Sequence, residues 1–351
     1  MSSLIPKQYS NLNKKELIEL CKTHQIKGYS NKKRDELIDM IQSNLNPVSQ
    51  IYNQYNVGDN LDLLKTLKDE SIDMIYTDPP YDTGRNFGDF NDKFVDFKAF
   101  IRPRIEECHR VLKKNGSIII HVEPRISHHI RYICDDVFGE NNFQNEIVWH
   151  SGGNAKNKYQ LARNHDTIIV YGKSSKTKFF PQYKPYDDKY KKGLKMCPHH
   201  KKLYSTSAAH NSQPDVNPRP NLRYEWKGNT RQWYFSIDKM KELDKDNRLE
   251  YNDKNIPRIK RFVDEMDGIP IRDTWDDISN TQGNEKLSYA TQKPIKLLER
   301  ILDLYTEEGD ICLDPFAGSG SLGRACIKNK RQYLLFDVNP NGKNVFEKSI
   351  S

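Results

Sequence analysis

Long apolar runs are missing from this sequence, and so is the apolar segment that would follow Met1 in a signal peptide. Charged residues make up 30% of the chain and the mean hydropathy is -0.87, which indicates a polar surface. We therefore expect a protein that has no membrane span, is not secreted, and stays in the cytoplasm, the nucleoid or the nucleus.

Paired cysteines are missing as well. The six cysteines are scattered along the chain without paired spacing, which argues against a disulfide framework. Cys197, His199, His200 and His210 carry atoms that can ligate a metal, but no second Cys-x2-Cys pair accompanies them. We predict no metal site from this weak pattern.

Acidic residues are too few to balance the basic ones. The net charge is +8 and the isoelectric point is about 8.9, which suits a polyanionic partner. With 351 residues, of which 36% are hydrophobic, the chain can bury a core and form more than one unit. Its patterning divides it into four predicted segments, residues 1–46, 50–172, 173–273 and 274–351.

The first segment reads as a helical hairpin. Apolar residues recur at helical spacing on both sides of a break at 28–30, namely Leu12, Leu17, Ile18 and Leu20 before it and Leu37, Ile38 and Ile41 after it. Lysines surround the break, and the whole pattern resembles a SAP motif, a short DNA-binding hairpin. Two interpretations stay open, DNA binding and a plain helical extension with solvated lysines.

From residue 51 onward the pattern alternates between strands and helices. We predict strands at 55–57, 72–77, 117–122, 146–149, 167–171, 310–313 and 332–336, and helices at 61–67, 97–113, 128–138, 294–305 and 322–328. Such alternation is typical of an α/β fold with a mostly parallel sheet that is covered on both faces.

The alternation stops between residues 173 and 273. This segment is rich in proline and mixes basic residues with tyrosine and tryptophan, as in Tyr224, Trp226 and Lys227. Cations can bind phosphates and flat rings can stack on bases, so the mixture favours contact with nucleic acid. An irregular insertion that is solvated by its lysines is the alternative.

The tetrapeptide Asp78-Pro79-Pro80-Tyr81 follows the predicted strand at 72–77. The strand must end there because neither proline has an N–H to donate to a sheet. A carboxylate and an aromatic ring are thus left at the carboxyl end of a strand, the edge where α/β sheets bind ligands. By itself the tetrapeptide could equally be a simple turn.

A glycine-rich turn, Asp314 to Ser321, follows the strand at 310–313, and the next strand ends in Asp337. This order of strand, glycine turn, helix and strand-end acid holds nucleoside cofactors, with the acid accepting hydrogen bonds from ribose. The turn lacks the third glycine of a dinucleotide site and the Lys-Ser/Thr of a P-loop. Because it begins with an acid, it suits a cofactor with a positive centre and an amine, such as S-adenosylmethionine.

The two turns together resemble the paired signature of amino-group DNA methyltransferases. Their order, with the tetrapeptide first, resembles the β group, which includes the modification subunits of type III restriction systems. The resemblance runs from about residue 50 to the end and includes several further segments: Thr83-Gly84, 91–94, Asn164-His165-Asp166, 275–278 and 291–294.

The resemblance implies a circularly permuted, Rossmann-like class I methyltransferase sheet, in which the strands before Asp78 and Asp314 lie side by side. It implies a target-recognition role for residues 173–273. The implied catalytic residues are Asp78, Pro79, Pro80 and Tyr81, and the implied cofactor-binding residues are Asp59, Lys293, Asp314, Phe316, Ala317, Gly318, Ser319, Gly320 and Asp337. Within this set Asp59 would reach the adenine ring of S-adenosylmethionine, and Lys293 would lie near its methionine end.

The implied activity is direct, in-line methyl transfer to the exocyclic N6 of an adenine flipped out of double-stranded DNA. Asp78 and the Pro79 carbonyl would accept the two amine hydrogens, while Tyr81 would stack on the base. Cytosine N4 is the alternative target, because the initial Asp only favours adenine. A catalytically silent DNA-binding relative, and an enzyme acting on RNA or on protein amides, are further alternatives.

Two departures from the family's pattern stand out. Asp82 occupies a position where Asn is usual, and Ser321-Leu322 replaces the commoner Thr-Thr. We expect neither to abolish activity. The resemblance also implies a homodimer, and the chain carries no helicase or nuclease signature from which a restriction partner could be read.

Overall fold

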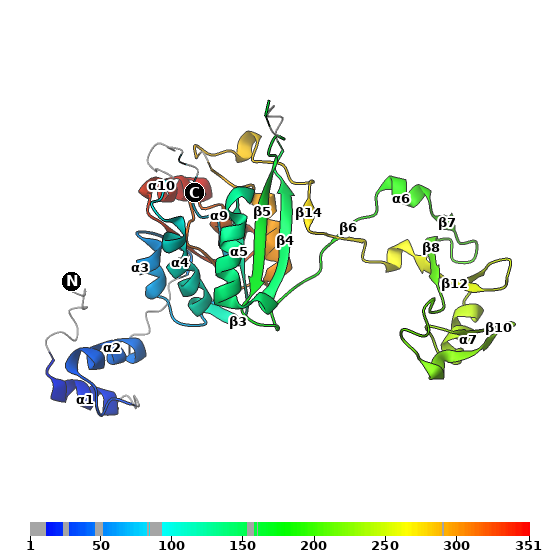
Figure 1. Ribbon diagram of the computed structural model, residues 1–351, viewed down its shortest axis with the longest axis horizontal. Coiled ribbons are helices and arrows are strands. Elements are labelled where there is room, and N and C mark those ends of the chain that lie inside the picture. The colour runs from blue at the N-terminus through cyan, green and yellow to red at the C-terminus, as the bar shows by residue number, and fades with distance from the viewer. Residues whose placement is uncertain are drawn as a thin grey trace. The chain divides into compact units, whose positions relative to one another are not determined.

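The computed structural model describes residues 12–23, 28–45, 52–82, 84, 93–152, 158–159, 161–289 and 291–351. It divides the chain into two compact units, of which the first comprises Met1–Phe180 and Asp273–Ser351 and the second Pro181–Arg272 (Figure 1). Each helix among the described residues is too short or too polar to span a bilayer.

The N-terminal hairpin consists of α1 (Lys14–Thr23) and α2 (Arg34–Leu45). Asn13 begins α1 with a capping box, because its side chain accepts from the Glu16 N–H while the Glu16 carboxylate accepts from the Asn13 N–H. The two helices bury a small apolar cluster formed by Leu17, Cys21, Leu37, Ile38 and Ile41. The predicted helices are confirmed, and DNA binding by them stays a prediction; residues 46–51, which follow the hairpin, lie outside the described residues.

A mixed sheet of eight strands forms the centre of the first unit. Its strands, in spatial order, are β1 (Gln54–Val57), β16 (Gln332–Asp337), β15 (Ile311–Asp314), β2 (Ile72–Thr77), β3 (Leu112–Val122), β5 (His165–Gly172), β4 (Phe143–His150) and β14 (Thr274–Trp275). Only β5 runs antiparallel to its neighbours. The predicted α/β class with a mostly parallel sheet is confirmed.

The predicted permutation is confirmed by the pairing of β15 with β2. Cys312 and Leu313 lie opposite Met74 and Ile75 in parallel register, although well over two hundred residues separate the strands along the chain. Parallel strands end at one edge of a sheet. The tetrapeptide after β2 and the glycine turn after β15 therefore lie at the same edge.

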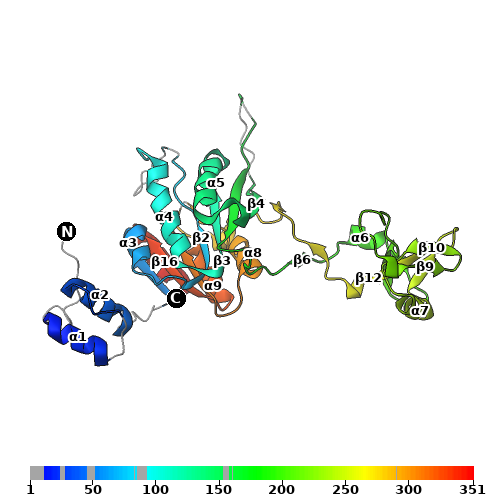
Figure 2. The ribbon, with the colours of Figure 1, turned by 60° about the horizontal axis from the view of Figure 1, so that its bottom comes forward.

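Helices cover both faces of this sheet (Figure 2). One face carries α4 (Phe97–Val111) and α5 (Pro124–Phe138), whose buried residues Ile101, Ile105 and Ile130 join the core with strand residues such as Ile75 and Ile118. The other face carries α8 (Ile295–Tyr305) and α9 (Ser321–Lys328), which pack against each other. The shorter α3 (Asn60–Lys65) contacts α4.

Two local predictions differ from the structure. We predicted a helix to residue 113 and a strand from residue 117, but β3 begins at Leu112, since Leu112 already pairs with Ile72 and a shift of register accommodates the next residues. The closing helix α10 (Pro340–Ile350) was not predicted, although Asn339 caps it and proline occupies its first turn.

The second unit is built mainly from short antiparallel strands. Its four-stranded sheet contains β11 (Leu249–Tyr251), β12 (Pro257–Phe262), β8 (Leu203–Ala208) and β7 (Lys195–Met196), and its other elements are β6 (Tyr183–Lys184) with β13 (Ile269–Pro270), the hairpin β9 (Arg223–Trp226) and β10 (Asn229–Gln232), α6 (Asp188–Lys192) and α7 (Ile237–Lys245). Its core is small, with Trp226, Trp233, Met240, Leu249 and Ile259 in one cluster. Single 3-10 turns occur at Glu140–Asn142, Pro220–Leu222, Val263–Glu265 and Gly283–Glu285.

Residues 173–180, which we assigned to the insertion, remain with the first unit. The N–H groups of Lys173 and Lys178 donate to the carbonyls of Gly116 and Asn115, and the Phe180 N–H donates to the Leu304 carbonyl. These bonds hold the segment on the sheet before the chain enters the second unit.

Candidate active site

The tetrapeptide and the glycine turn face each other across one cavity of about 1330 Å³. Tyr81 and Phe316 both lie in its lining. Of the predicted site residues, the lining includes Asp59, Asp78, Pro79, Pro80, Tyr81, Lys293, Asp314, Phe316, Ala317, Gly318, Ser319 and Asp337. Two turns that are remote in the sequence thus form one site.

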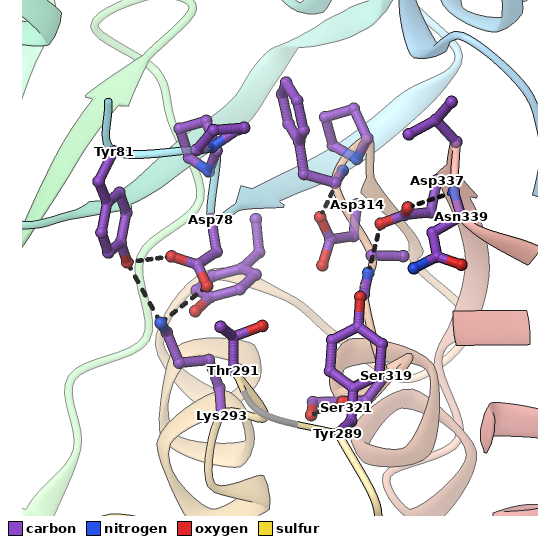
Figure 3. A pocket seen from close by; sticks show the side chains of 18 of the residues that line it. Asp78, Tyr81, Tyr289, Thr291, Lys293, Asp314, Ser319, Ser321, Asp337 and Asn339 are labelled. Atoms are coloured by element: carbon purple, nitrogen blue, oxygen red, sulfur yellow. Dashed lines mark hydrogen bonds and ion pairs between the residues drawn. The ribbon is translucent and has the colours of Figure 1, made fainter. Parts of the chain in front are cut away.

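Asp78, Tyr81 and Lys293 form a compact polar group at one end of the cavity (Figure 3). The Lys293 ammonium lies 2.7 Å from Asp78 Oδ2 and 3.2 Å from the Tyr81 hydroxyl. The Tyr81 hydroxyl donates to Asp78 Oδ1. Both oxygens of the Asp78 carboxylate therefore already accept from side chains of the site.

The glycine turn is held by backbone contacts to Asp337 and Tyr55. Asp337 accepts from the Gly318 N–H and from the Asn339 N–H, each at 2.8 Å, and the Tyr55 hydroxyl donates to the Gly318 carbonyl at 2.7 Å. Gly318 has a φ of +52°, a left-handed conformation that favours glycine. These bonds fix the turn with its backbone exposed to the cavity.

Gly320 was predicted to bind the cofactor, but it is not in the cavity lining. It precedes α9 in the left-handed region, and a Cβ atom on it would lie only 2.4 Å from the Phe346 ring. The structure therefore gives this glycine a packing role, because α10 places Phe346 against the turn.

Asp314 is buried and its carboxylate is directed into the cavity (Figure 3). One oxygen accepts from the Phe316 N–H at 3.0 Å. Burial raises the pKa of Asp314 well above its usual value, and the nearby charges of Asp78 and Asp337 act in the same direction. The pKa of Asp337 is also raised, again by burial.

Asp59 lies in the cavity lining and also stabilises the local fold. Its side chain caps α3 by accepting from the Leu61 N–H at 2.8 Å, and it pairs with the Arg104 guanidinium at 3.0 Å. Arg104 is itself buried and donates to the Asn60 side chain at 2.6 Å. About half of the Asp59 side chain, 53%, stays exposed, so it can still accept from a ligand.

A buried hydrogen-bond chain beside the tetrapeptide was not predicted. His121 Nε2 lies 3.0 Å from Asp166 and His121 Nδ1 lies 2.9 Å from the Tyr76 hydroxyl. Burial lowers the pKa of His121, so the ring is neutral near pH 7. Nε2–H therefore donates to Asp166, and Nδ1 accepts from Tyr76.

Tyr76 and Asp166 both line the cavity, so the hydrogen bonds through His121 connect two of its lining residues. Burial acts to raise the pKa of Asp166, but the hydrogen bond from His121 and the charge of Lys293 lower it below its usual value. The segment Asn164-His165-Asp166 did point to this place as part of the resemblance. Nothing in the sequence linked it to His121, which lies on another strand.

Tyr289 is a second residue that sequence reasoning missed. A Cβ atom on Gly318 would lie 3.2 Å from its ring, so the ring rests against the glycine turn. Asn339 also lies in the lining, two residues after Asp337.

Asp82, directly after the tetrapeptide, has a φ of +52° and accepts from the Phe94 N–H at 3.1 Å. Thr83 and residues 91–92 lie outside the described residues.

The lining matches the groups of S-adenosylmethionine. Asp314 offers an acceptor for a cationic amine, and the Phe316 ring offers an apolar face. Asp337 has oxygen lone pairs beyond those that its two backbone donors use. The residues present therefore fit this cofactor.

Comparisons with known proteins agree with this site. A family described as DNA methylase matches residues 72–348. The Type II methyltransferase M.KpnI of Klebsiella pneumoniae is 25% identical over 80% of this chain and 78% of its own length. The DNA adenine methyltransferase YhdJ of Escherichia coli is 28% identical over 80% of this chain and 77% of its own length.

Two other similarities are less complete or more distant. The StyLTI Mod subunit of a type III restriction-modification enzyme of Salmonella typhimurium is 26% identical over 79% of this chain, which spans half, 50%, of that relative. Among solved structures, the cytosine-N4-specific PvuII DNA methyltransferase aligns over 84% of each chain with 13% identity and a TM-score of 0.51. The latter similarity supports the fold.

Proposed function

The chain belongs to the DNA methylase family, and from this premise we propose that it methylates the exocyclic N6 of adenine in double-stranded DNA. Its cofactor is S-adenosylmethionine. The observation that carries the proposal is the single cavity in which Asp78 and Tyr81 face Asp314 and Asp337. A base would enter beside the tetrapeptide and the cofactor would lie along the glycine turn.

We assign the cofactor to the glycine-turn side of the cavity. Asp337 would accept from its ribose hydroxyls, Asp314 from its amine, and Phe316 would pack on its adenine, near Asp59. When bound, S-adenosylmethionine supplies an electrophilic methyl group on a sulfonium. The carboxylate of Asp314 also complements this positive charge.

The exocyclic amine of a base is a poor nucleophile, since its lone pair is delocalised into the ring. Asp78 and the Pro79 carbonyl accept its two hydrogens, which lets the nitrogen pyramidalise and direct its lone pair along the line of transfer. Tyr81 provides the ring on which the flipped base stacks. None of these steps needs a covalent intermediate with the enzyme.

The resemblance places Lys293 near the methionine end of the cofactor, and its contacts indicate a further role. Its contacts are with Asp78 and Tyr81 at the base end of the cavity. We propose that Lys293 and the Tyr81 hydroxyl hold the Asp78 carboxylate until the target amine replaces one of them as donor. A carboxylate held in this way is oriented before the base arrives.

The second unit supports the proposal that residues 181–272 recognise the target. Tyr183, Tyr190 and Tyr234 expose about 40–50% of their surface, as stacking on bases would need. Lys202 and Lys227 are paired with Asp264 and Asp244, so the phosphate contacts would come from other cations. Arg219 and Arg223 are exposed and suit that role.

Cytosine N4 remains the second candidate target. The relative YhdJ is named an adenine methyltransferase, whereas the structural neighbour PvuII is named cytosine-N4-specific. Either amine presents two hydrogens to Asp78 and Pro79, so these two groups do not choose between them. We favour adenine only because, in the family that the two turns resemble, a tetrapeptide that begins with Asp is more typical of adenine enzymes.

The test uses the full chain, labelled S-adenosylmethionine, and duplex DNA, RNA and protein as acceptors, with the product identified after digestion to nucleosides. We expect labelled N6-methyldeoxyadenosine from DNA alone; labelled N4-methylcytosine would select the second candidate. Asp78→Ala should bind the cofactor normally and lose transfer, whereas Glu308→Gln, at an exposed surface position, should bind the cofactor normally and keep transfer. Normal transfer by Asp78→Ala would contradict the assigned role.

A further inference from the structure

Three metal-binding side chains gather in the second unit, on segments that the proposed reaction does not use. One potential ligand atom from each of His199, His200 and Asp246 lies within 4.8 Å of the other two. We propose that these residues bind one divalent transition-metal ion, best matched by zinc, and that Cys197 orients His200 without ligating the ion. This proposal replaces our prediction of no metal site.

The two histidines lie on a closed turn between β7 and β8. The Cys197 N–H donates to the Lys202 carbonyl at 2.9 Å, and the Lys201 N–H donates to the Cys197 carbonyl at 2.8 Å. Lys201 has a φ of +53°, which tightens the turn. The backbone thus presents His199 and His200 side by side with their positions fixed at both ends.

Asp246 is contributed by a different element, because it is the C-cap residue of α7. Its N–H donates to the Glu242 carbonyl at 2.9 Å, which anchors its backbone to the last turn of that helix. Its side chain is 58% exposed and can rotate toward the histidines. An ion held here would join a turn at residue 200 to a helix end more than forty residues later.

The measured separation already suits a shared ion. His200 Nε2 lies 3.5 Å from Asp246 Oδ1. Zinc bonds to nitrogen and carboxylate oxygen are about 2.0–2.2 Å long, so two such ligands on a tetrahedral ion lie about 3.4 Å apart. His199 is exposed and needs only a side-chain rotation to complete the set.

Cys197 makes His200 ready to bind through Nε2. Its sulfur is buried, lies 3.4 Å from His200 Nδ1, and accepts from the backbone N–H groups of His199 and His200. The Lys260 ammonium lies 3.8 Å from the same sulfur. Because donors surround this sulfur, His200 Nδ1 carries the proton, and the Nε2 lone pair is left for the metal.

The donor set decides which ion fits. Two imidazoles and one carboxylate favour zinc or a similar first-row ion over calcium or magnesium, which prefer oxygen ligands. A water molecule would complete a tetrahedron. The ion would serve as a staple, because the second unit has only the small clusters around Trp233 and around Phe262 to hold it.

The experiment uses the full chain without an affinity tag. After dialysis against zinc, we expect one zinc per chain by mass spectrometry and competition with a chromogenic chelator. Asp246→Asn and His200→Ala should each weaken zinc binding at least tenfold, and Cys197→Ala about 10–100-fold through the orientation of His200. Asp238→Asn, an exposed acid on the same helix, should leave it unchanged.

Cobalt distinguishes the assigned ligands from other arrangements. The wild-type cobalt form should show visible bands but no intense sulfur-to-cobalt band in the near ultraviolet. Such a band would make Cys197 a ligand and overturn our assignment. Equal zinc content in the wild type and in Asp246→Asn would show an adventitious ion only, provided that both zinc-free proteins melt at the same temperature.

Discussion

Affinity for the cofactor should rise with pH because Asp314 must give up a proton to meet a cation. Burial holds the pKa of Asp314 well above its usual value in the free protein, so its protonated form persists to higher pH than that of an exposed aspartate. The cationic amine and sulfonium of S-adenosylmethionine favour the carboxylate and lower the pKa of Asp314 in the complex. Binding therefore releases a proton wherever the pH lies between these two pKa values.

The size of the pH effect on cofactor affinity follows from the titration of this one group. Each pH unit between the two pKa values changes the affinity up to tenfold, or about 1.4 kcal/mol, and the affinity levels off above the pKa of the free protein. In the cofactor-free protein, the contribution of Asp314 to folding stability has the opposite pH dependence. A carboxyl whose pKa is raised on folding stabilises the protein at low pH, and this contribution is lost as pH rises through the raised pKa.

Asp314→Asn provides the matched variant. Its amide oxygen can still accept from the Phe316 N–H, so the turn keeps its bond while the titrating proton disappears. Losing a hydrogen bond to a charged group costs about 1.5–3 kcal/mol, which predicts roughly 10–150-fold weaker cofactor binding at high pH. The cofactor affinity of this variant should also no longer depend on pH.

Calorimetry in two buffers of different ionisation enthalpy counts the protons that binding releases. We expect release by the wild type and by Asp337→Asn, since the ribose that Asp337 meets is neutral, and no release by Asp314→Asn. A wild type that releases no proton anywhere between about pH 5 and pH 9 would refute the reasoning, as would undiminished release by Asp314→Asn.

Three further predictions concern residues in the cavity lining or packed beside it. Gly320→Ala should destabilise the protein by about 2–5 kcal/mol in urea unfolding, because the added methyl meets Phe346 in a left-handed backbone, whereas Gly283→Ala meets no neighbour and should cost less. Lys293→Met should keep cofactor affinity but slow single-turnover methyl transfer, because Asp78 loses its ammonium; a loss of affinity with normal transfer would instead favour the methionine-end role. His121→Phe should cost about 1–3 kcal/mol by leaving the Tyr76 hydroxyl and Asp166 without their partner. Because burial lowers the pKa of His121 from 6.5, wild-type stability should fall as pH drops below that value, and a His121→Phe variant with the same pH dependence would contradict this.

Sequence reasoning succeeded where local chemistry determines the structure. The prolines after β2 and the glycines after β15 end their strands for reasons that hold in any context, and the two turns were identified from these residues alone. It was less complete where the partner is remote. That Lys293 and Asp59 bind the cofactor stays a prediction, but the sequence did not indicate that Lys293 pairs with Asp78 or that Asp59 pairs with Arg104.

The chain by itself determined the α/β class, the two turns and the kinds of side chain that they carry, since these depend on periodicity and on backbone restrictions of single residues. The pairing of β15 with β2 was implied by the family resemblance, whereas tertiary structure alone decided that Gly320 supports Phe346 and that Tyr76, His121 and Asp166 form one chain. The physical reason is that such contacts join residues from different strands, and their geometry exists only after the sheet has paired.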